Sequence, residues 1–221
     1  MGKDKLRRFA ENDTFHNMFQ EQYLDLKEKG GFFLKGKWRQ EFFKNDNPIV
    51  LELGCGKGEY TVGLAEKYIE KNFIGIDIKG ARMWRGCKTS NENGMNNVAF
   101  IRSQIEIIDM YFGENEVDEI WITFPDPQLK KPNKRLTSNR FLERYRKVLK
   151  KGALIHLKTD SKELYDFTMD EVLIPNKMNV LFNSDNLYGS GLNDDVIEIK
   201  TFYEGIYLSQ SKPITYIKFE I

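Results

Sequence analysis

The stretch that most restricts what this chain can fold into is residues 49–58, IVLELGCGKG. It begins with an apolar, mostly β-branched run, which is typical of a buried strand in a parallel sheet. Gly54, Gly56 and Gly58 follow, and they permit a tight turn and a close approach of the backbone to a ligand. Residues 60–68 then show the spacing of apolar side chains that a helix needs. Strand, glycine loop and helix in this order predict a nucleotide-type site in which backbone N–H groups face the ligand.

The spacing of the glycines separates this loop from two other phosphate-binding motifs. The dinucleotide fingerprint has the form G-x-G-x-x-G, whereas the third glycine here comes one residue early, and no G-x-x-x-x-G-K-[ST] sequence occurs. An acid before G-x-G-x-G, here Glu52, resembles motif I of the class I S-adenosylmethionine-dependent methyltransferases. A second apolar run, residues 73–78, contains Asp77 about 20 residues after the loop, where a carboxylate can accept hydrogen bonds from both ribose hydroxyls. This acid disfavours the alternative of an ordinary glycine-rich turn.

Further apolar runs extend the same pattern along the chain. They predict strands at residues 49–53, 73–78, 98–101, 117–124, 153–158, 178–182 and 215–221, with helices between the first five. Five βα strands followed by a terminal pair resemble the Rossmann-like, seven-stranded class I methyltransferase sheet. That resemblance, not periodicity, implies an α/β fold with helices on both faces and a mostly parallel sheet whose last strand is antiparallel.

No linker or repeat divides the strands, so we expect one methyltransferase domain over residues 47–221, preceded by a basic and aromatic arm, residues 1–46. A helix is expected at residues 15–29. Residues 32–43 mix aromatic and basic side chains, which is typical either of contact with nucleic acid or of an arm that packs on its own domain. Both interpretations stay open at this point.

Composition restricts the class of protein. The 221 residues are 40% hydrophobic and 30% charged, as in soluble globular proteins. No apolar run of about 18 residues predicts a membrane span, and the first residues do not resemble a secretory signal. Cys55 and Cys87 have no metal-ligand spacing and no expected disulfide partner. We therefore expect a cytoplasmic protein without a metal site.

The formal net charge of +1 conceals an uneven distribution. Residues 130–151 contain ten Lys or Arg side chains and a single acid, Glu143. A helix starting at Thr137 or Ser138 and reaching Lys151 is expected to carry much of this charge on its outer side. A solvated helix face is the alternative. The near absence of acids in a segment beside a catalytic loop favours contact with phosphates, and binding of this kind should weaken as the salt concentration rises.

Two carboxylates follow neighbouring strands of the predicted sheet. Asp126 lies in Pro125-Asp126-Pro127, directly after the fourth strand, and Asp160 ends the fifth strand within H-L-K-T-D. Ligands of doubly wound sheets bind at the carboxyl ends of the strands, so both should face one cleft. His156, between apolar neighbours in mid-strand, is expected to be a core residue. The order F-P-D-P-Q does not match the Asn/Asp-Pro-Pro-aromatic motif of methyltransferases that act on exocyclic amines.

Taken together, F-P-D-P, the following K-K and K-R-L, H-L-K-T-D and a late T-x-Y-E resemble the bacterial tRNA (guanine-N7)-methyltransferase family. The likeness runs from about residue 35 to the end. It implies transfer of the methyl group of S-adenosylmethionine to N7 of a guanine in the tRNA variable loop. It also implies tRNA as the partner and no obligatory protein partner, and it leaves monomer and homodimer open.

The resemblance also assigns roles by position. It implies catalytic roles for Asp126 and Asp160. The implied cofactor contacts are Glu52, Gly54, Gly56, Asp77, Gln104 and Asp126. The implied contacts to the tRNA guanine are Lys130, Asp160, Thr201, Tyr203 and Glu204. The chain departs from the family at Gln128, where tryptophan is usual, and at Gln104, where an acid is usual; the Gln104 carbonyl oxygen can still accept from the adenine amine.

Guanine N7 carries an in-plane lone pair and no proton, so its methylation needs no general base. Catalysis can then consist mostly of positioning. Carboxylates at Asp126, Asp160 and Glu204 are able to accept hydrogen bonds from the guanine N1–H and N2–H₂ edge and to favour the positive charge that develops. Two alternatives stay open: methylation of another RNA base position, and a non-catalytic RNA-binding protein with the same fold.

Overall fold

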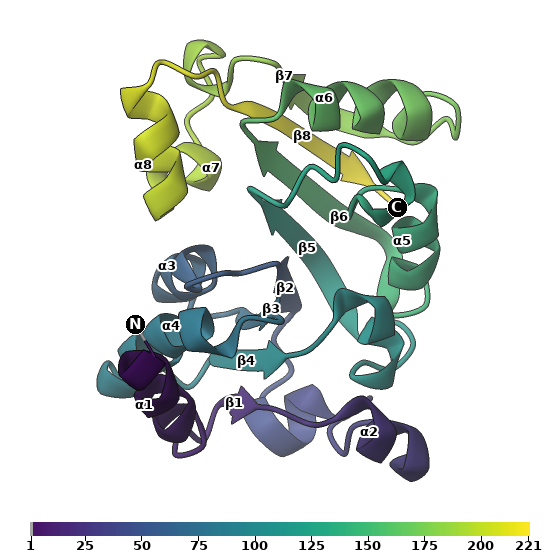
Figure 1. Ribbon diagram of the computed structural model, residues 1–221. Coiled ribbons are helices and arrows are strands. Elements are labelled where there is room, and N and C mark those ends of the chain that lie inside the picture. Colours follow the sequence, from purple (N-terminus) through teal and green to yellow (C-terminus); the bar gives the residue numbers. More distant parts are fainter. Residues whose placement is uncertain (1) are drawn as a thin grey trace.

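A mixed sheet forms the centre of the computed structural model, which describes residues 2–221 (Figure 1). Within this part of the chain the sheet has eight strands in the order β1-β4-β3-β2-β5-β6-β8-β7. Their bounds are β1 (Met18–Phe19), β2 (Ile49–Leu53), β3 (Asn72–Asp77), β4 (Val98–Arg102), β5 (Val117–Thr123), β6 (Leu149–Thr159), β7 (Val180–Ser184) and β8 (Thr215–Glu220). Strands β1 to β6 pair in parallel, and β8 runs antiparallel to both β6 and β7.

The expected fold class is confirmed. Each of the seven predicted strands is present, and the antiparallel pairing at the end of the sheet is the one that the resemblance implied. The additional strand, β1, is only two residues long and pairs with β4, so it offered no periodicity to recognise. Strand β2 lies between β3 and β5, which makes the end of β2 the point where the strand order reverses. Ligands of open α/β sheets bind at that point.

Side chains of the strands alternate between two hydrophobic layers. Val50, on β2, faces the layer that contains side chains of α3 and α4, whereas its neighbour Leu51 faces the layer that contains those of α2, α5 and α6. Figure 1 shows α3 and α4 on one side of the sheet and α5 and α6 on the other. The α-helices are α1 (Gly2–Asn12), α2 (Tyr23–Lys29), α3 (Glu59–Lys67), α4 (Gly80–Glu92), α5 (Asn139–Tyr145), α6 (Lys162–Asp166), α7 (Asp195–Glu198) and α8 (Phe202–Ser209). Shorter or wider helical turns are η1 (Trp38–Phe43), η2 (Ile105–Met110), η3 (Pro132–Lys134), η4 (Phe167–Leu173) and η5 (Leu187–Gly189). None of the helices in residues 2–221 is long and apolar enough to cross a bilayer.

Two expected helices have other bounds. The helix expected at residues 15–29 begins only at Tyr23, because Met18 and Phe19 add to the edge of the sheet instead. The helix expected to reach Lys151 starts after Ser138 but ends at Tyr145, because Leu149 already pairs with Val117 as part of β6. In both cases strand pairing overrides local helical spacing.

The aromatic side chains of the N-terminal arm point mostly inward. Trp38 is fully buried, and its Nε1–H donates to the carbonyl oxygen of Tyr111 at 2.9 Å. The Phe19 ring packs edge-on against Trp38 and Phe32, with 5.3 Å between ring centroids in each pair. These aromatics therefore pack on the domain, whereas Lys35 and Lys37 stay exposed.

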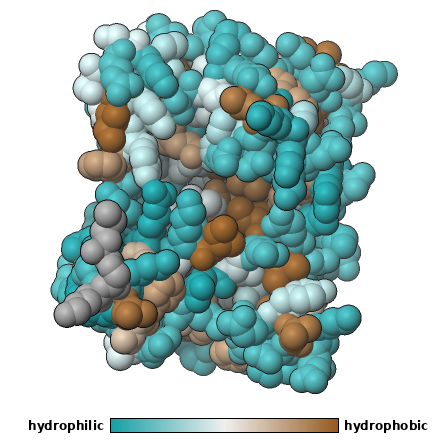
Figure 2. All heavy atoms as spheres, in the orientation of Figure 1, coloured by the Kyte–Doolittle hydropathy of each residue, from teal (hydrophilic) through white to brown (hydrophobic). Residues whose placement is uncertain are grey.

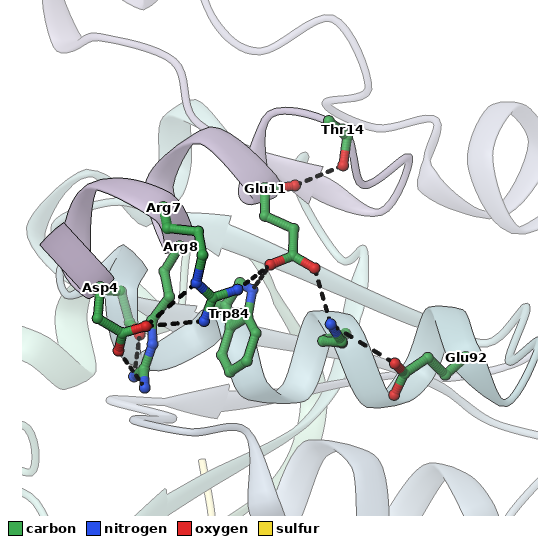
Figure 3. Close-up of polar contacts among 9 residues, drawn as sticks. Asp4, Arg7, Arg8, Glu11, Thr14, Trp84 and Glu92 are labelled. Atoms are coloured by element: carbon green, nitrogen blue, oxygen red, sulfur yellow. Dashed lines mark hydrogen bonds and ion pairs between the residues drawn. The ribbon is translucent and has the colours of Figure 1, made fainter.

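The first helix, which the sequence analysis did not predict, docks on α4 through charged side chains (Figure 3). The Glu11 carboxylate accepts from Trp84 Nε1 at 2.8 Å and pairs with Lys88 at 3.0 Å and Arg7 at 2.9 Å. The guanidinium groups of Arg7 and Arg8 lie over the Trp84 ring, 5.1 and 4.8 Å from its centroid. These basic side chains of α1 thus hold the helix to the domain.

Candidate functional site

The glycine loop lies at the reversal point of the sheet, directly after β2. Gly56 has a left-handed backbone with φ 57°, and its N–H donates to Asp77 Oδ2 at 2.9 Å. Gly58 also has a left-handed backbone with φ 73°, and a Cβ there would lie 2.6 Å from the Phe100 ring. Gly58 therefore leaves no room for a side chain, and Gly56 adopts a backbone conformation that favours glycine. Asp77 Oδ1 accepts from Lys79 N at 2.8 Å, so the Asp77 carboxylate joins the loop to the start of α4.

Glu52 lies beneath the loop. Its carboxylate accepts hydrogen bonds from Thr61 N at 2.8 Å, from Thr61 Oγ1 at 2.5 Å and from Thr123 Oγ1 at 2.8 Å. Burial raises the pKa of Glu52 to about 7, against these hydrogen bonds, which act in the opposite direction. The residue thus links β2, α3 and β5. Sequence reasoning missed Thr61 and Thr123, because threonines in a helix and a strand carry no signal of their own.

A pocket of about 370 Å³ opens at the carboxyl ends of β3 and β4. Gln104 and Ile78 line it, and Ile78 leaves 57% of its surface exposed. Residues 20–23 of the N-terminal arm form part of its wall. The structure therefore places Gln104 in a cavity next to Asp77. The contribution of the arm was not foreseen, because residues 20–23 follow no motif.

The Pro-Asp-Pro loop is held in one shape by its own backbone and by a buried arginine. Phe124 and Gln128 flank the motif and both have a left-handed backbone with φ 47°, which is strained for residues other than glycine. Arg135 Nε donates to the carbonyl oxygen of Pro127 at 2.9 Å, and its guanidinium pairs with Glu163 at 2.7 Å. Asp126, at the tip, is exposed, and its Oδ1 accepts from Gln128 N at 3.0 Å. Strained backbone of this kind is common at functional sites.

Asp160 directly follows Thr159, the last residue of the neighbouring strand β6. Thr123 of β5 and Lys158 of β6 are register partners, and Phe124 N donates to the Lys158 carbonyl oxygen at 2.8 Å. The loops that carry Asp126 and Asp160 therefore leave the sheet side by side. The Asp160 side chain is about 20% exposed, and its carboxylate lies 3.5 Å from Lys212 Nζ.

His156 is a core residue, as expected. Its ring stacks on Trp121 with 4.0 Å between centroids, and its Nδ1 shares a 2.7 Å hydrogen bond with the Tyr216 hydroxyl. Burial lowers the pKa of His156. The ring lies within the sheet layer and takes no part in the candidate site.

The T-x-Y-E segment, residues 201–204, starts helix α8. Thr201 Oγ1 accepts from Glu204 N at 3.1 Å and so caps the helix. The Tyr203 hydroxyl accepts from Arg82 of α4 at 2.5 Å. Phe202 N donates to Glu59 of α3 at 3.1 Å. The start of α8 therefore lies against the two helices that follow the glycine loop and Asp77.

Glu204 differs from the other predicted substrate residues because its carboxylate faces inward. Its side chain is 0% exposed and lies 2.5 Å from Lys158 Nζ. The Tyr188 hydroxyl donates to it at 2.6 Å. Asp126 and Tyr203 are exposed and Asp160 and Thr201 are half-buried, whereas Glu204 is buried.

Residues 130–151, the basic segment, carry less unpaired charge than their composition indicates. Arg135 pairs with Glu163, Lys147 with Asp109, and Lys150 with Asp118. The side chains of Lys130, Lys131 and Lys134 are exposed, and within residues 4–221 no acid pairs with them. These three lysines follow the Pro-Asp-Pro loop directly. Within residues 4–221, Arg140, Arg146 and Lys151 are also exposed without an acid partner, so the unpaired positive charge extends from the Pro-Asp-Pro loop past α5 to the start of β6.

Figure 2 shows how the surface is shaped on the face seen in Figure 1. A hollow crosses the middle of this face, between the part with α1 and β4 and the part with α5, α6 and α8, and hydrophobic side chains gather in it. Hydrophilic surface surrounds the hollow. A concave, partly apolar site with a polar rim suits a nucleoside-sized ligand.

Comparisons with known proteins identify the family. The profile of a family described as "Putative methyltransferase" matches residues 46–215. The chain is 53% identical to a tRNA (guanine-N(7)-)-methyltransferase of Bacteroides fragilis, over 99% of this chain and 86% of that protein. It is 54% identical to a protein of the same name from Christiangramia forsetii, over 99% of this chain and 98% of that protein. Among solved structures, the 16S rRNA methyltransferase KamB superposes with a TM-score of 0.65 at 15% identity, over 85% of this chain and 94% of that one, which supports the fold alone.

Proposed function

The chain belongs to the tRNA (guanine-N7)-methyltransferase family, and from this premise we propose how its residues divide the work of the reaction. It is an S-adenosylmethionine-dependent enzyme that methylates guanine N7 in tRNA. We propose the roles of individual residues, the position of the guanine in the variable loop of tRNA, and a cytoplasmic location without an obligatory protein partner. The observation that carries it is the position of Asp126 and Asp160 directly after the carboxyl ends of neighbouring strands, with Asp126 exposed and Asp160 half-buried.

The residues around the glycine loop fit an adenosine-containing cofactor. Gly54 and Gly56 bring the backbone close to a ligand, and the Asp77 carboxylate has acceptor capacity beyond the two N–H groups that it already binds. Gln104 lines the neighbouring pocket of about 370 Å³, which suits an adenine ring. Glu52 joins β2 to α3 and β5 through Thr61 and Thr123, and Asp126 follows β5, the strand that pairs with β2. S-adenosylmethionine supplies the methyl group to this site.

The substrate side follows from charge and exposure. Asp126 and Asp160 accept hydrogen bonds from the N1–H and N2–H₂ edge of the guanine, and their charge favours the cationic product. N7 attacks with its own lone pair, so neither carboxylate removes a proton. Lys130, beside Asp126, contacts a phosphate of the tRNA. Thr201, Tyr203 and Glu204 form the segment that closes the guanine site on the side of α8.

The setting of the enzyme is part of the proposal. We propose that the enzyme acts without an obligatory protein partner, as a monomer or a homodimer. We place the enzyme in the cytoplasm with its tRNA substrate. Size-exclusion chromatography with light scattering, alone and with tRNA, distinguishes monomer from homodimer.

The test is methyl transfer from labelled S-adenosylmethionine to unmodified tRNA, followed by nucleoside analysis. We expect the label in 7-methylguanosine of the variable loop, and a loss of rate of about 100-fold or more in Asp160→Asn. The matched control is Asp170→Asn, an exposed carboxylate of η4, which should leave the rate unchanged. Label in another nucleoside would favour the alternative base position, and cofactor-independent RNA binding without transfer would favour the non-catalytic alternative.

A further inference from the structure

A buried ion pair connects strand β6, which Asp160 follows, with helix α8, which follows Thr201. Lys158 Nζ lies 2.5 Å from Glu204 Oε1, and both side chains are 0% exposed. Removing two charges from water costs several kcal/mol per ion, so such a pair persists only when its hydrogen bonding is complete. Lys158 does not reach the open side of the site, and no step of methyl transfer requires it.

The hydrogen bonding of this pair is complete. The Lys158 ammonium has three donors, and it contacts three acceptors: Glu204, the Tyr60 hydroxyl at 2.8 Å and the carbonyl oxygen of Val196. The Glu204 carboxylate accepts from Tyr188 and also from the N–H of Thr201 at 3.3 Å. An ammonium that finds three acceptors inside the protein fixes the positions of all three.

The groups that Lys158 joins belong to both halves of the site. Tyr60 is the second residue of α3, directly after the glycine loop. Glu204 and Thr201 form a capping box at the start of α8, so the position of the Glu204 carboxylate determines that of the Thr201 backbone. The contact between Glu59 and Phe202 N reinforces the same junction. The lysine therefore couples the cofactor loop to the segment at residues 201–204.

We propose that Lys158 is a positioning residue for methyl transfer, which holds residues 201–204 in register with the cofactor loop through Glu204 and touches neither reactant. This inference rests on the proposed function, because it takes residues 201–204 to bind the tRNA guanine. When Lys158 is replaced by an apolar residue, the Glu204 carboxylate loses its counter-charge and turns toward water. The start of α8 then moves with it, away from α3.

The test compares Lys158→Met with Lys162→Met. Lys162 is an exposed lysine whose ion pair is with Asp166 of its own helix, so it serves as the matched control. Steady-state kinetics with tRNA and S-adenosylmethionine varied separately, together with hydrogen–deuterium exchange of residues 201–209, provide the readouts. For Lys158→Met we expect kcat/KM for tRNA to fall by about 100-fold, cofactor affinity to stay within about twofold, and exchange of α8 to accelerate at least about tenfold. Lys162→Met should match the wild type in all three.

Wild-type kcat/KM in Lys158→Met would overturn the inference. An equal loss of cofactor affinity, tRNA turnover and global stability would also overturn it, because it would reduce Lys158 to a stabiliser of the whole fold. If Lys158→Met does not fold, Tyr188→Phe removes one donor to Glu204 and keeps the ion pair, and a several-fold loss for tRNA is then expected, while no change would contradict the proposal. A wild-type enzyme that transfers no methyl to tRNA would refute the proposed function instead, and the exchange of α8 would still report whether Lys158 anchors that helix.

Discussion

Glu52 is the carboxylate whose environment makes the strongest quantitative prediction. It is buried beneath the glycine loop with a pKa of about 7, against an ordinary value of 4.5. A carboxyl group with a higher pKa in the folded state binds more protons when folded, so the free energy of unfolding falls as pH rises from 4.5 to 7. Above pH 7 the ionised form costs about 3 kcal/mol, at about 1.4 kcal/mol per pH unit. Below pH 4.5 this cost is absent.

The perturbation that isolates this cost is Glu52→Gln. The amide keeps the shape of the side chain, its carbonyl oxygen can still accept from Thr61 N and Thr61 Oγ1, and its NH₂ group can donate to the Thr123 hydroxyl oxygen. The variant therefore avoids the buried charge and keeps the hydrogen bonds. Relative to the wild type, its free energy of unfolding should increase by about 2–3 kcal/mol between pH 5 and pH 8.

The assay is urea unfolding of both proteins at the two pH values, with equal m-values as the check that the same surface unfolds. Glu66→Gln, on the exposed side of α3, is the matched control and should differ from the wild type by the same amount at both pH values. If the difference in free energy of unfolding between Glu52→Gln and the wild type does not grow with pH, the argument from burial of Glu52 is refuted. Methyl transfer should fall in the same variant, because it removes the charge of a proposed cofactor contact, so stability and activity are expected to change in opposite directions.

Two further predictions concern the loop and the RNA surface. Gly58→Ala should lower the free energy of unfolding by about 2–4 kcal/mol in thermal or urea unfolding, because its Cβ would lie 2.6 Å from the Phe100 ring. Gly94 has a similar φ of 63° with open space around it, so Gly94→Ala should cost only about 1 kcal/mol. Equal losses would mean that backbone strain alone determines the loss of stability at Gly58. Replacing Lys130, Lys131 and Lys134 by Ala should reduce the slope of log affinity for tRNA against log salt concentration by about 2. The control Lys150→Ala should leave the slope unchanged, because the Lys150 ammonium already pairs with Asp118. An unchanged slope in the triple variant would place the tRNA elsewhere.

The predictable parts of this protein are those that depend on residues close together in the chain. The strands follow from apolar runs, and the glycine loop with Asp77 follows from a strand–turn–helix pattern; the structure joins the two through the hydrogen bond from Gly56 to Asp77. The end of α5 did not follow from local spacing. Its last predicted turns are taken by β6, because Leu149 gains a partner in Val117 that an isolated helix cannot offer. The outcome there depends on which strand is adjacent, and the sequence of the segment does not contain that information.

The partners of charged residues are also not determined by the local sequence, and here this affects the surface that binds RNA. A count over residues 130–151 treats every lysine and arginine as free, yet Arg135, Lys147 and Lys150 have acidic partners far away in the chain. Lys158 illustrates the converse. On a strand as buried as β6, alternation places Lys158 on the same face as His156, inside the protein, so a charge at this position requires a buried counter-charge. That requirement can be read from the sequence, but the identity of the partner, Glu204, arises only when α8 folds back over the end of the sheet.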